Sequence, residues 1–491
     1  MATDTAKIGV RRGISILFFS ALPVMFTPAL RAAEGPGSSV PSLPKIRVSA
    51  DGRTLEIAAG RPFVPFGVTY FRPGTGWAPQ VWKQFDAEAT RKDFARMKEL
   101  GVNCVRVFLS YGSFYQEPGR LAPEGLAKFD QFLEIAQQAG IYVHPTGPDH
   151  WEGTPAWAQD DRYADEAALR RTEDFWRLFA ARYRGRSGIF AYDLLNEPEV
   201  RWNTAAMREK WNRWIEKKYA SGENLRRAWG MTNTPPGFGA VPVPPETDCA
   251  GCPRVLDFQH FREEIADEWT RRQVAVIKTA DPQALVTVGM IQWSVPAVLP
   301  SCRHYSGFRP ERQARWLDFL EIHFYPLARG FYAYEGPEDE ARNLAYLESV
   351  VREVARPGKP VVIAECGWYG GGKLTLDQSR HPPATEEQQA RWCSQLVETS
   401  AGLASGWLNW GLCDDPGAGD VTQLTGLLTT DGQLKAWGRG FEGLARRFAG
   451  RVLPPRPIGP RPTLDWSLCT TSAAEGRKFS AAYLEAWKAA R

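Results

Sequence analysis

The sequence predicts a barrel of eight parallel β-strands with helices between them, because three observations agree. From about residue 60 onward, short apolar runs alternate with amphipathic stretches, which is the pattern of an α/β protein. The apolar runs number eight, and the span 60–450 suits a (β/α)8 barrel, or TIM barrel, with insertions. A doubly wound sheet is the competing architecture, but no glycine-rich phosphate loop follows the first strand.

Each expected element rests on its own local pattern. Strands are apolar runs such as PFVPFGVTY and VNCVRVFLS, whereas the stretch EATRKDFARMKELG has helical spacing and ends on a glycine. The expected strands are 62–70, 102–110, 141–147, 188–198, 284–290, 316–326, 360–365 and 405–411. The expected helices are 88–101, 123–140, about 166–184, 338–356 and 384–402.

Two segments depart from the regular alternation. Residues 199–283 form an extended insertion between strands 4 and 5, with a Pro/Gly-rich piece, and we expect it to shape one wall of a cleft. The barrel domain is expected to cover 60–450. Residues 451–491 then read as a proline-rich C-terminal arm with a terminal helix at 474–491.

The N-terminus has the pattern of an export signal. Lys7, Arg11 and Arg12 precede the apolar stretch ISILFFSALPVMFTPAL, and small residues follow it. The stretch is near the lower length limit for a membrane span, so a membrane anchor is the alternative. We favour a signal peptide over 1–33, a lead-in over 34–59, an exported protein (periplasmic or extracellular), and no stable membrane span after cleavage.

Composition excludes some functions and favours others. Of 491 residues, 43% are hydrophobic and 24% charged, as in an ordinary soluble enzyme, and the net charge is only +4. No block of like charge occurs, so nothing points to nucleic acid. The 19 Trp residues favour a flat, amphipathic ligand such as a sugar. Candidate stacking platforms, for which plain packing is the equal alternative, are Trp77, Trp202, Trp293 and Trp368.

The chain has eight cysteines, and one close pair stands out. Cys249 and Cys252 are expected to form a loop disulfide or to remain free thiols. A zinc site is the minor alternative, which Cys302 and His304 would have to complete. The cysteines at 104, 366 and 413 fall in or near strands and are expected to be buried.

Two glutamates end apolar strands of the expected barrel. Glu197 follows the fourth strand in AYDLLNEP, and Glu365 ends the seventh in PVVIAEC. All strands of such a barrel run parallel, so both carboxylates should lie at the same, C-terminal rim. A lone glutamate there would be a solvated acid, but a pair across a cleft is what glycoside hydrolysis needs.

The blocks LLNEP, EIHFYP, VVIAECG and GWLNWG together resemble retaining glycoside hydrolases of clan A, most closely the family 5 cellulase and mannanase type. The resemblance runs from about residue 60 to 445. It implies that Glu197 is the acid/base and Glu365 the nucleophile, with no metal or other cofactor. The substrate-binding residues that it implies are Arg106 beneath the nucleophile, Asn196 on the sugar 2-hydroxyl, His323, Tyr325 and the sugar platform Trp410.

One departure from the family concerns the third strand. The family often has a histidine shortly after it, and the stretch IYVHPTGPDHWEGTP offers His144 and His150, neither at the commonest spacing. We prefer His150 as a substrate-binding residue, because a loop after the strand reaches the site. Trp151 beside it could line the cleft. His144 is expected to be buried, where it could support Arg106.

The expected protein is therefore an exported, monomeric endo-β-glycoside hydrolase. It would cleave β-mannan or β-1,4-glucan through a covalent glycosyl-enzyme, with Glu197 of raised pKa and Glu365 ionised. The modified third-strand loop favours mannan slightly. Alternatives are an exo-acting β-glycosidase or transglycosylase, a carbohydrate-binding barrel without activity, and a structural envelope protein. The binding barrel would normally have lost one glutamate, and no sequence feature favours the envelope protein.

Overall fold

The predicted barrel is confirmed in the computed structural model. Eight parallel strands close into a barrel in the order β10-β11-β4-β5-β6-β7-β8-β9. The barrel strands are β4 (Phe66–Thr69), β5 (Cys104–Ser110), β6 (Tyr142–Asp149), β7 (Tyr192–Asn196), β8 (Val286–Ile291), β9 (Leu320–Phe324), β10 (Val361–Cys366) and β11 (Trp407–Trp410). The structure describes residues 42–57, 60–75, 78–149, 155–158, 161–245, 248–327, 336–376, 380–454 and 458–490.

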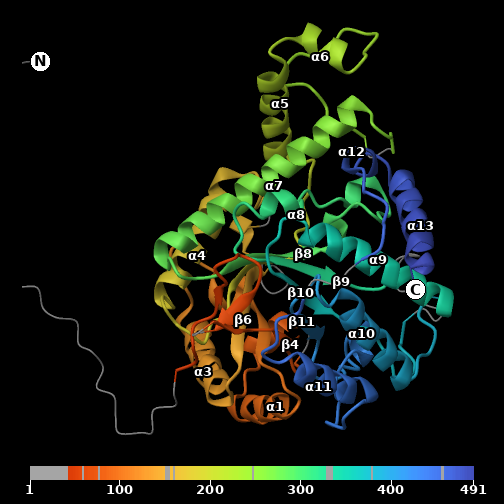
Figure 1. The fold of residues 1–491 in the computed structure, drawn as a ribbon. Coiled ribbons are helices and arrows are strands. Elements are labelled where there is room, and N and C mark those ends of the chain that lie inside the picture. The colour runs from red at the N-terminus through yellow and green to blue at the C-terminus, as the bar shows by residue number, and fades with distance from the viewer. Residues whose placement is uncertain are drawn as a thin grey trace, which may run out of the picture. The chain divides into compact units, whose positions relative to one another are not determined.

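Helices surround the barrel (Figure 1). They are α1 (Ala87–Glu99), α2 (Tyr111–Phe114), α3 (Pro123–Ala139), α4 (Glu166–Arg182), α5 (Ala205–Tyr219), α6 (Gly222–Ala228), α7 (Pro253–Ala280), α8 (Pro310–Gln313), α9 (Pro337–Ala355), α10 (Glu386–Ser400), α11 (Ala436–Phe448), α12 (Trp466–Cys469) and α13 (Ala473–Ala489). Several begin where the sequence indicates. Asp86 caps α1 with its carboxylate, and Thr385 forms a capping box with Gln388 at α10.

The N-terminal end of the barrel is closed by apolar side chains. Inward-facing residues such as Cys104, Phe319 and Leu408 form a buried cluster with Ile46 and Leu55. A small antiparallel sheet covers this end and consists of β1 (Arg47–Val48), β2 (Leu55–Ile57) and β3 (Arg61–Pro62). Ile46 immediately precedes β1, and Leu55 is the first residue of β2. Two of the three strands of this sheet lie inside the segment 34–59. The packed floor excludes water from below, so polar groups in the barrel are reached from the opposite end.

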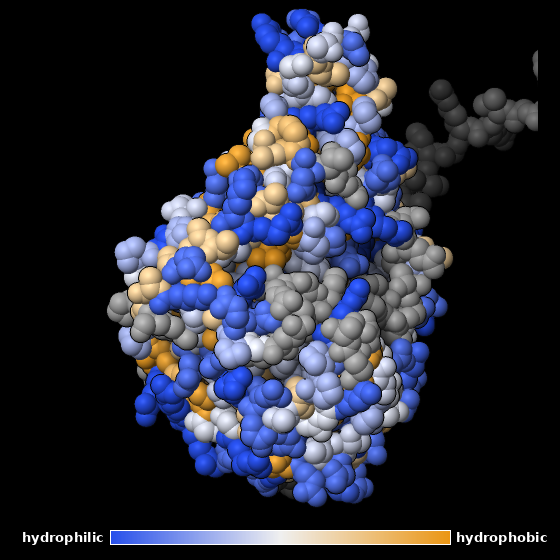
Figure 2. Space-filling model, turned by 90° about the vertical axis from the view of Figure 1, so that its right-hand side faces the viewer, coloured by the Kyte–Doolittle hydropathy of each residue, from blue (hydrophilic) through white to orange (hydrophobic). Residues whose placement is uncertain are grey.

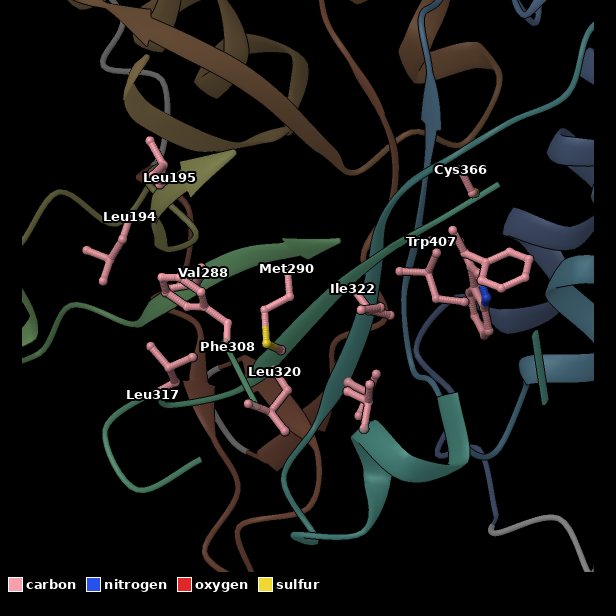
Figure 3. Close-up of a cluster of buried hydrophobic side chains, with 14 of the residues drawn as sticks. Leu194, Leu195, Val288, Met290, Phe308, Leu317, Leu320, Ile322, Cys366 and Trp407 are labelled. Atoms are coloured by element: carbon pink, nitrogen blue, oxygen red, sulfur yellow. The ribbon is translucent and has the colours of Figure 1, made fainter. Parts of the chain in front are cut away.

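The other faces of the strands pack against the helices. Val288 and Met290 of β8 and Leu320 and Ile322 of β9 lie in one large cluster of buried hydrophobic residues (Figure 3). Side chains alternate along a strand, so the residues between them face the barrel interior. One of these intervening residues is Glu321, which is polar. The apolar outer face therefore fixes the register that turns polar groups inward.

Helices α5, α6 and α7 separate β7 from β8, in the segment 199–283. In Figure 1, α5 and α6 project beyond the barrel, and the long α7 lies between them and the strands. A disulfide joins Cys249 to Cys252 just before α7. Cys302 instead contacts Asp248 through its thiol, and the possible metal-ligand groups in the described part of the chain include none of these cysteines. The disulfide interpretation is confirmed and the zinc alternative is wrong.

The C-terminal segment ends in α13, which packs against α9. Within it Tyr483 donates a hydrogen bond to Glu348 of α9, to which Arg461 also donates. On the face drawn in Figure 2, hydrophobic residues are scattered among hydrophilic ones. Among the described residues, no helix has the length and apolarity to cross a bilayer.

Candidate active site

The two predicted carboxylates lie close together at the C-terminal rim. Glu197 follows β7, the fourth barrel strand, and Glu365 belongs to β10, the seventh. One oxygen of each carboxylate lies within 4.8 Å of the other. Carboxyl groups about 5–5.5 Å apart are typical of double displacement, whereas about 6.5–9.5 Å leaves room for a water in single displacement. Oxygens this close leave too little room for a water held between the two carboxylates, which favours a covalent intermediate.

Glu365 accepts a hydrogen bond on each oxygen. Arg106 donates from Nη1 to Oε2 over 3.1 Å, and the Tyr325 hydroxyl donates to Oε1 over 2.8 Å. Burial raises the pKa of Glu365, and the charge of Glu197 adds to this, while Arg106 and Tyr325 oppose the rise. Both donors stabilise the ionised form. The two contacts thus stabilise the ionised form of Glu365, which a nucleophile requires, whereas burial favours the protonated form.

Arg106 is completely buried on β5 and is held by a second acid. Its Nη2 donates to Asp193 Oδ2 over 2.9 Å and to Asn196 Oδ1 over 2.8 Å. Asp193 also accepts from the Thr146 hydroxyl over 2.9 Å. The Arg106 contact orients the Asn196 amide, because with Oδ1 on the guanidinium the Nδ2 donors remain for a ligand.

Glu197 lies in a different environment from Glu365. Its side chain is 27% exposed, and its Oε1 lies 3.1 Å from Nδ1 of His323. Its φ of 37° is in the left-handed region, which costs a residue with a side chain about 1–2 kcal/mol. The Glu197 amide is fixed by donation to the Gly289 carbonyl over 2.8 Å. Loss of solvation raises the pKa of Glu197 to about 7, as a proton donor needs.

His323 lies between the two carboxylates and is completely buried. Its Nδ1 is 3.6 Å from Glu365 Oε2, in addition to its contact with Glu197. Burial lowers the pKa of His323 to about 4, although the charge of Glu365 opposes the change. The imidazole is therefore neutral at ordinary pH. One of its ring nitrogens can then donate a hydrogen bond and the other can accept one, but the two nitrogens cannot both donate.

Aromatic side chains form one wall beside the carboxylates. Trp410 packs with Phe71, Phe108 and Tyr325 in a cluster at the mouth of the barrel. Its Nε1 donates to the Thr422 hydroxyl over 2.7 Å, which fixes the plane of the ring. A fixed aromatic face suits the apolar side of a sugar ring.

The other predicted residues fall in different places. His150, Trp151 and Trp77 lie outside the described residues. Trp368 is 2% exposed and packs against Tyr369 with ring centroids 4.6 Å apart. Trp202 and Trp293 are packed against other side chains, Trp202 under the guanidinium of Arg262 and Trp293 against His304.

Sequence reasoning missed three residues of the site: Asp193, Glu321 and Gly289. Asp193 and Glu321 are completely buried and stand as charged residues inside apolar runs. A charged residue inside an apolar strand is costly unless it is paired, so this signal could have found them. Gly289 carries no such signal. Its amide donates to Asp193 Oδ1 over 2.6 Å, and its carbonyl holds Glu197.

Gly289 leaves room for three functional groups. A Cβ placed there would lie 3.0 Å from Asp193 Oδ2, 3.0 Å from His323 Nε2 and 3.1 Å from Arg106 Nη2. We expect Gly289→Ala to lower the free energy of unfolding by about 1–3 kcal/mol, because an added methyl overpacks the site. Thermal unfolding measures this. Gly188→Ala is the matched control, since nothing lies within 4 Å of a Cβ there. Equal stability of the two variants would contradict the expectation.

Among the described residues, two groups of side chains bring possible metal-ligand atoms within 4.8 Å of one another: His144, Asp193 and Glu321, and Glu197, His323 and Glu365. The guanidinium of Arg106 lies between them, donates to Asp193 and Glu365, and is 3.7 Å from Glu321. Arg106 thus occupies the position in which a cation would balance these acids. The carboxylates and imidazoles of these two groups are chemically suited to acid/base and nucleophilic roles.

A (β/α)8 barrel with two closely spaced carboxylates after its fourth and on its seventh strand has the features of a retaining glycoside hydrolase. The comparison with protein families agrees. The model of Cellulase (glycosyl hydrolase family 5) matches residues 58–415. The chain belongs to glycosyl hydrolase family 5.

Curated relatives match only parts of this chain. A β-xylosidase of Phanerodontia chrysosporium is 30% identical over 149 residues, which are 27% of this chain and 29% of that protein. A β-galactosidase of Thermus thermophilus is 26% identical over 243 residues, 44% of this chain and 37% of that protein. The matched regions thus span well under half the length of both relatives.

Solved structures show the same fold at low identity. An exo-β-1,4-mannosidase from Opitutaceae bacterium strain TAV5 has a TM-score of 0.58 at 18% identity, over 82% of this chain and 62% of that one. A GH5_18 protein from Streptomyces cattleya, in complex with Manβ1-4GlcNAc, has a TM-score of 0.58 at 19% identity, over 87% and 90%.

Proposed function

We propose that this protein hydrolyses β-glycosides with retention of configuration. The observation that carries the proposal is the pair of carboxylates within 4.8 Å, one with a pKa of about 7 and the other bonded to Arg106 and Tyr325. Two acids in such different environments are suited to the two roles of a double displacement.

In the first step Glu197 gives its proton to the glycosidic oxygen while Glu365 attacks the anomeric carbon. The leaving group departs as an alcohol, and the sugar becomes an ester of Glu365. In the second step Glu197 takes a proton from water, which attacks the same carbon and releases Glu365 as a carboxylate. We expect the Nδ2 donors of Asn196 to bind the sugar 2-hydroxyl through both steps, because its Oδ1 accepts from Arg106.

We further propose that the enzyme removes single sugars from the ends of short β-linked oligosaccharides, with β-mannosides as the first candidate. Support comes from the name exo-β-1,4-mannosidase of one structural neighbour, and the names β-xylosidase and β-galactosidase of two relatives also denote enzymes of β-glycosides. Endo cleavage of β-mannan or β-1,4-glucan, expected from the sequence, is the second candidate, and the family description Cellulase favours it. We also propose that the protein is exported, with residues 1–33 as its signal peptide, and that it is a monomer.

A substrate panel tests both candidates. Mature protein and Glu365→Ala are incubated with aryl β-glycosides, manno- and cello-oligosaccharides, β-mannan and soluble cellulose, and the products are sized early in the reaction. Monosaccharide alone supports exo action, whereas a ladder of oligosaccharides from one polymer supports endo action. Folded wild-type protein that releases no more sugar than the variant on every substrate contradicts the proposed hydrolysis.

We expect kcat/KM to depend on pH as a bell. Glu197 must carry a proton, and its pKa is about 7, so activity falls as pH rises through that value. Glu365 must be ionised, and burial raises its pKa, so the acidic limb lies above the usual pKa of a glutamate, about 4.3. A pH series on an aryl glycoside measures both limbs. Glu197→Gln should remove the basic limb, and a basic limb that survives would show that another group supplies the proton.

A further inference from the structure

His144 and Glu321 form a buried pair beneath the two catalytic carboxylates. The Nε2 of His144 lies 3.0 Å from Glu321 Oε2, and its Nδ1 lies 2.9 Å from the carbonyl oxygen of Ala191. Both side chains are completely buried. Since a carbonyl can only accept, Nδ1 carries a hydrogen, and Nε2 faces a carboxylate. A proton must therefore lie between Nε2 and Oε2, on one atom or the other.

The surroundings of the pair show why this proton matters. Glu321 Oε1 has no hydrogen-bond partner among the described residues. It lies 3.7 Å from Arg106 Nε and 4.0 Å from His323 Nε2. The rings of Phe190 and Phe319 pack on His144, with centroids 5.2 and 6.2 Å away. Apart from His144, Arg106 is the cation that lies near Glu321 among the described residues, but it also pairs with Asp193 and Glu365. The described residues of the layer below are apolar and offer no further charge.

A charge count extends the argument to the nucleophile. The charged or titratable groups that face the pair are Arg106 and Cys104 from β5, Asp193 from β7, His323 from β9 and Glu365 from β10. Arg106 balances only one of Asp193 and Glu365. If the pair lacked its proton, a second uncompensated negative charge would lie beside Glu365. Like charges in a buried site raise each other's pKa.

We propose that His144 is a positioning residue that keeps the His144–Glu321 pair electrically neutral, so that the single uncompensated negative charge of the site resides on Glu365. Because the pair is neutral, the positive charge of Arg106 remains available to Asp193 and to the nucleophile Glu365. The direction of the His144 pKa agrees, since burial would lower it but the charge of Glu321 raises it overall. The inference rests on the proposed function, because it concerns the ionisation of the nucleophile.

A double-mutant cycle tests this assignment. His144→Gln keeps a hydrogen-bonding side chain but removes the cation, which leaves Glu321 as a buried anion or forces it to take a proton. Glu321→Gln removes the charge itself, and its amide can donate to neutral His144 Nε2. The double variant has neither charge. The readouts are kcat/KM on an aryl β-glycoside from pH 4 to 9, and thermal unfolding.

We expect His144→Gln to lower kcat/KM at pH 6 at least tenfold and to shift the acidic limb upward by about one pH unit, as a nearby buried anion would. Glu321→Gln should lower kcat/KM less than His144→Gln does and should leave the acidic limb near its wild-type pH, and the double variant should recover most of the loss of His144→Gln. If His144→Gln does not fold, a folded and active double variant gives the same support.

Other results overturn the assignment. A double variant as impaired as His144→Gln, or worse, shows that the two side chains matter for packing and not for charge. An unshifted acidic limb in His144→Gln shows that His144 is not needed to keep a second negative charge away from Glu365, which also overturns the assignment. Failure of the proposed function looks different, because wild-type protein would then be inactive on every glycoside of the panel.

Discussion

Replacement of Glu365 by alanine is expected to lower kcat by at least about 10⁴-fold, because a nucleophile that acts together with its acid/base partner cannot be replaced by water at the same position. Binding of substrate should change much less, since Glu365 acts mainly in the transition state. Initial rates on an aryl β-glycoside measure the loss. Glu88→Ala is the matched control, because the Glu88 side chain is 77% exposed at the surface.

Added azide gives the same variant a stereochemical readout. Alanine leaves space where the carboxylate was, and a small anion can enter it beside Arg106. Azide then attacks the anomeric carbon of a β-glycoside once, so the product should be the α-glycosyl azide, and NMR distinguishes it from the β form. Activity within tenfold of wild type, or a β-configured azide, would remove Glu365 from the role of nucleophile.

Most of the fold could be predicted because local periodicity and global architecture agree in this chain. The apolar run at 102–110 contains β5, and the helical spacing at 123–140 contains α3 almost to the residue. Helix α11 was not predicted, and neither was the small sheet of β1, β2 and β3. Those strands are only two or three residues long, too short for an alternating pattern to be recognised.

The residues of the site could be predicted from the sequence more readily than the contacts among them. Glu197 and Glu365 stand where strands end, and Arg106 is conspicuous between valines, so all three could be found in the sequence. The contacts among the buried polar residues need geometry. Asp193 and Asn196 both contact Arg106. The two residues are three positions apart, and on a regular strand their side chains would therefore point to opposite faces of the sheet.

An irregularity of β7 explains this contact. The pairing of β7 with β8 shifts between Asp193 and Asn196, and such a bulge lets both side chains turn inward. Simple alternation cannot foresee the shift. The same holds for β10, whose register against β9 changes between Ile363 and Glu365. The strands that bear the two catalytic candidates are thus both irregular next to them.

Replacement of Glu197 by alanine should give a loss that depends on the leaving group. Protonation helps a poor leaving group most, so hydrolysis of an oligosaccharide should slow by about 10²–10⁴-fold. A dinitrophenyl glycoside needs no acid for departure, so its first step should remain fast and the ester of Glu365 should accumulate. A burst of dinitrophenol, and mass spectrometry of the intact protein, measure this. Equal losses on both substrates would mean that Glu197 is not the acid.

The azide experiment also separates the two glutamates in this variant. With Glu365 still present, the sugar is first transferred to the enzyme and then to azide, so two inversions give the β-glycosyl azide. Glu365→Ala undergoes one inversion and gives the α form. His323 contacts Glu197 at 3.1 Å and Glu365 at 3.6 Å, so a general disturbance of the site would affect both variants alike. Opposite configurations therefore can come only from distinct roles of the two carboxylates.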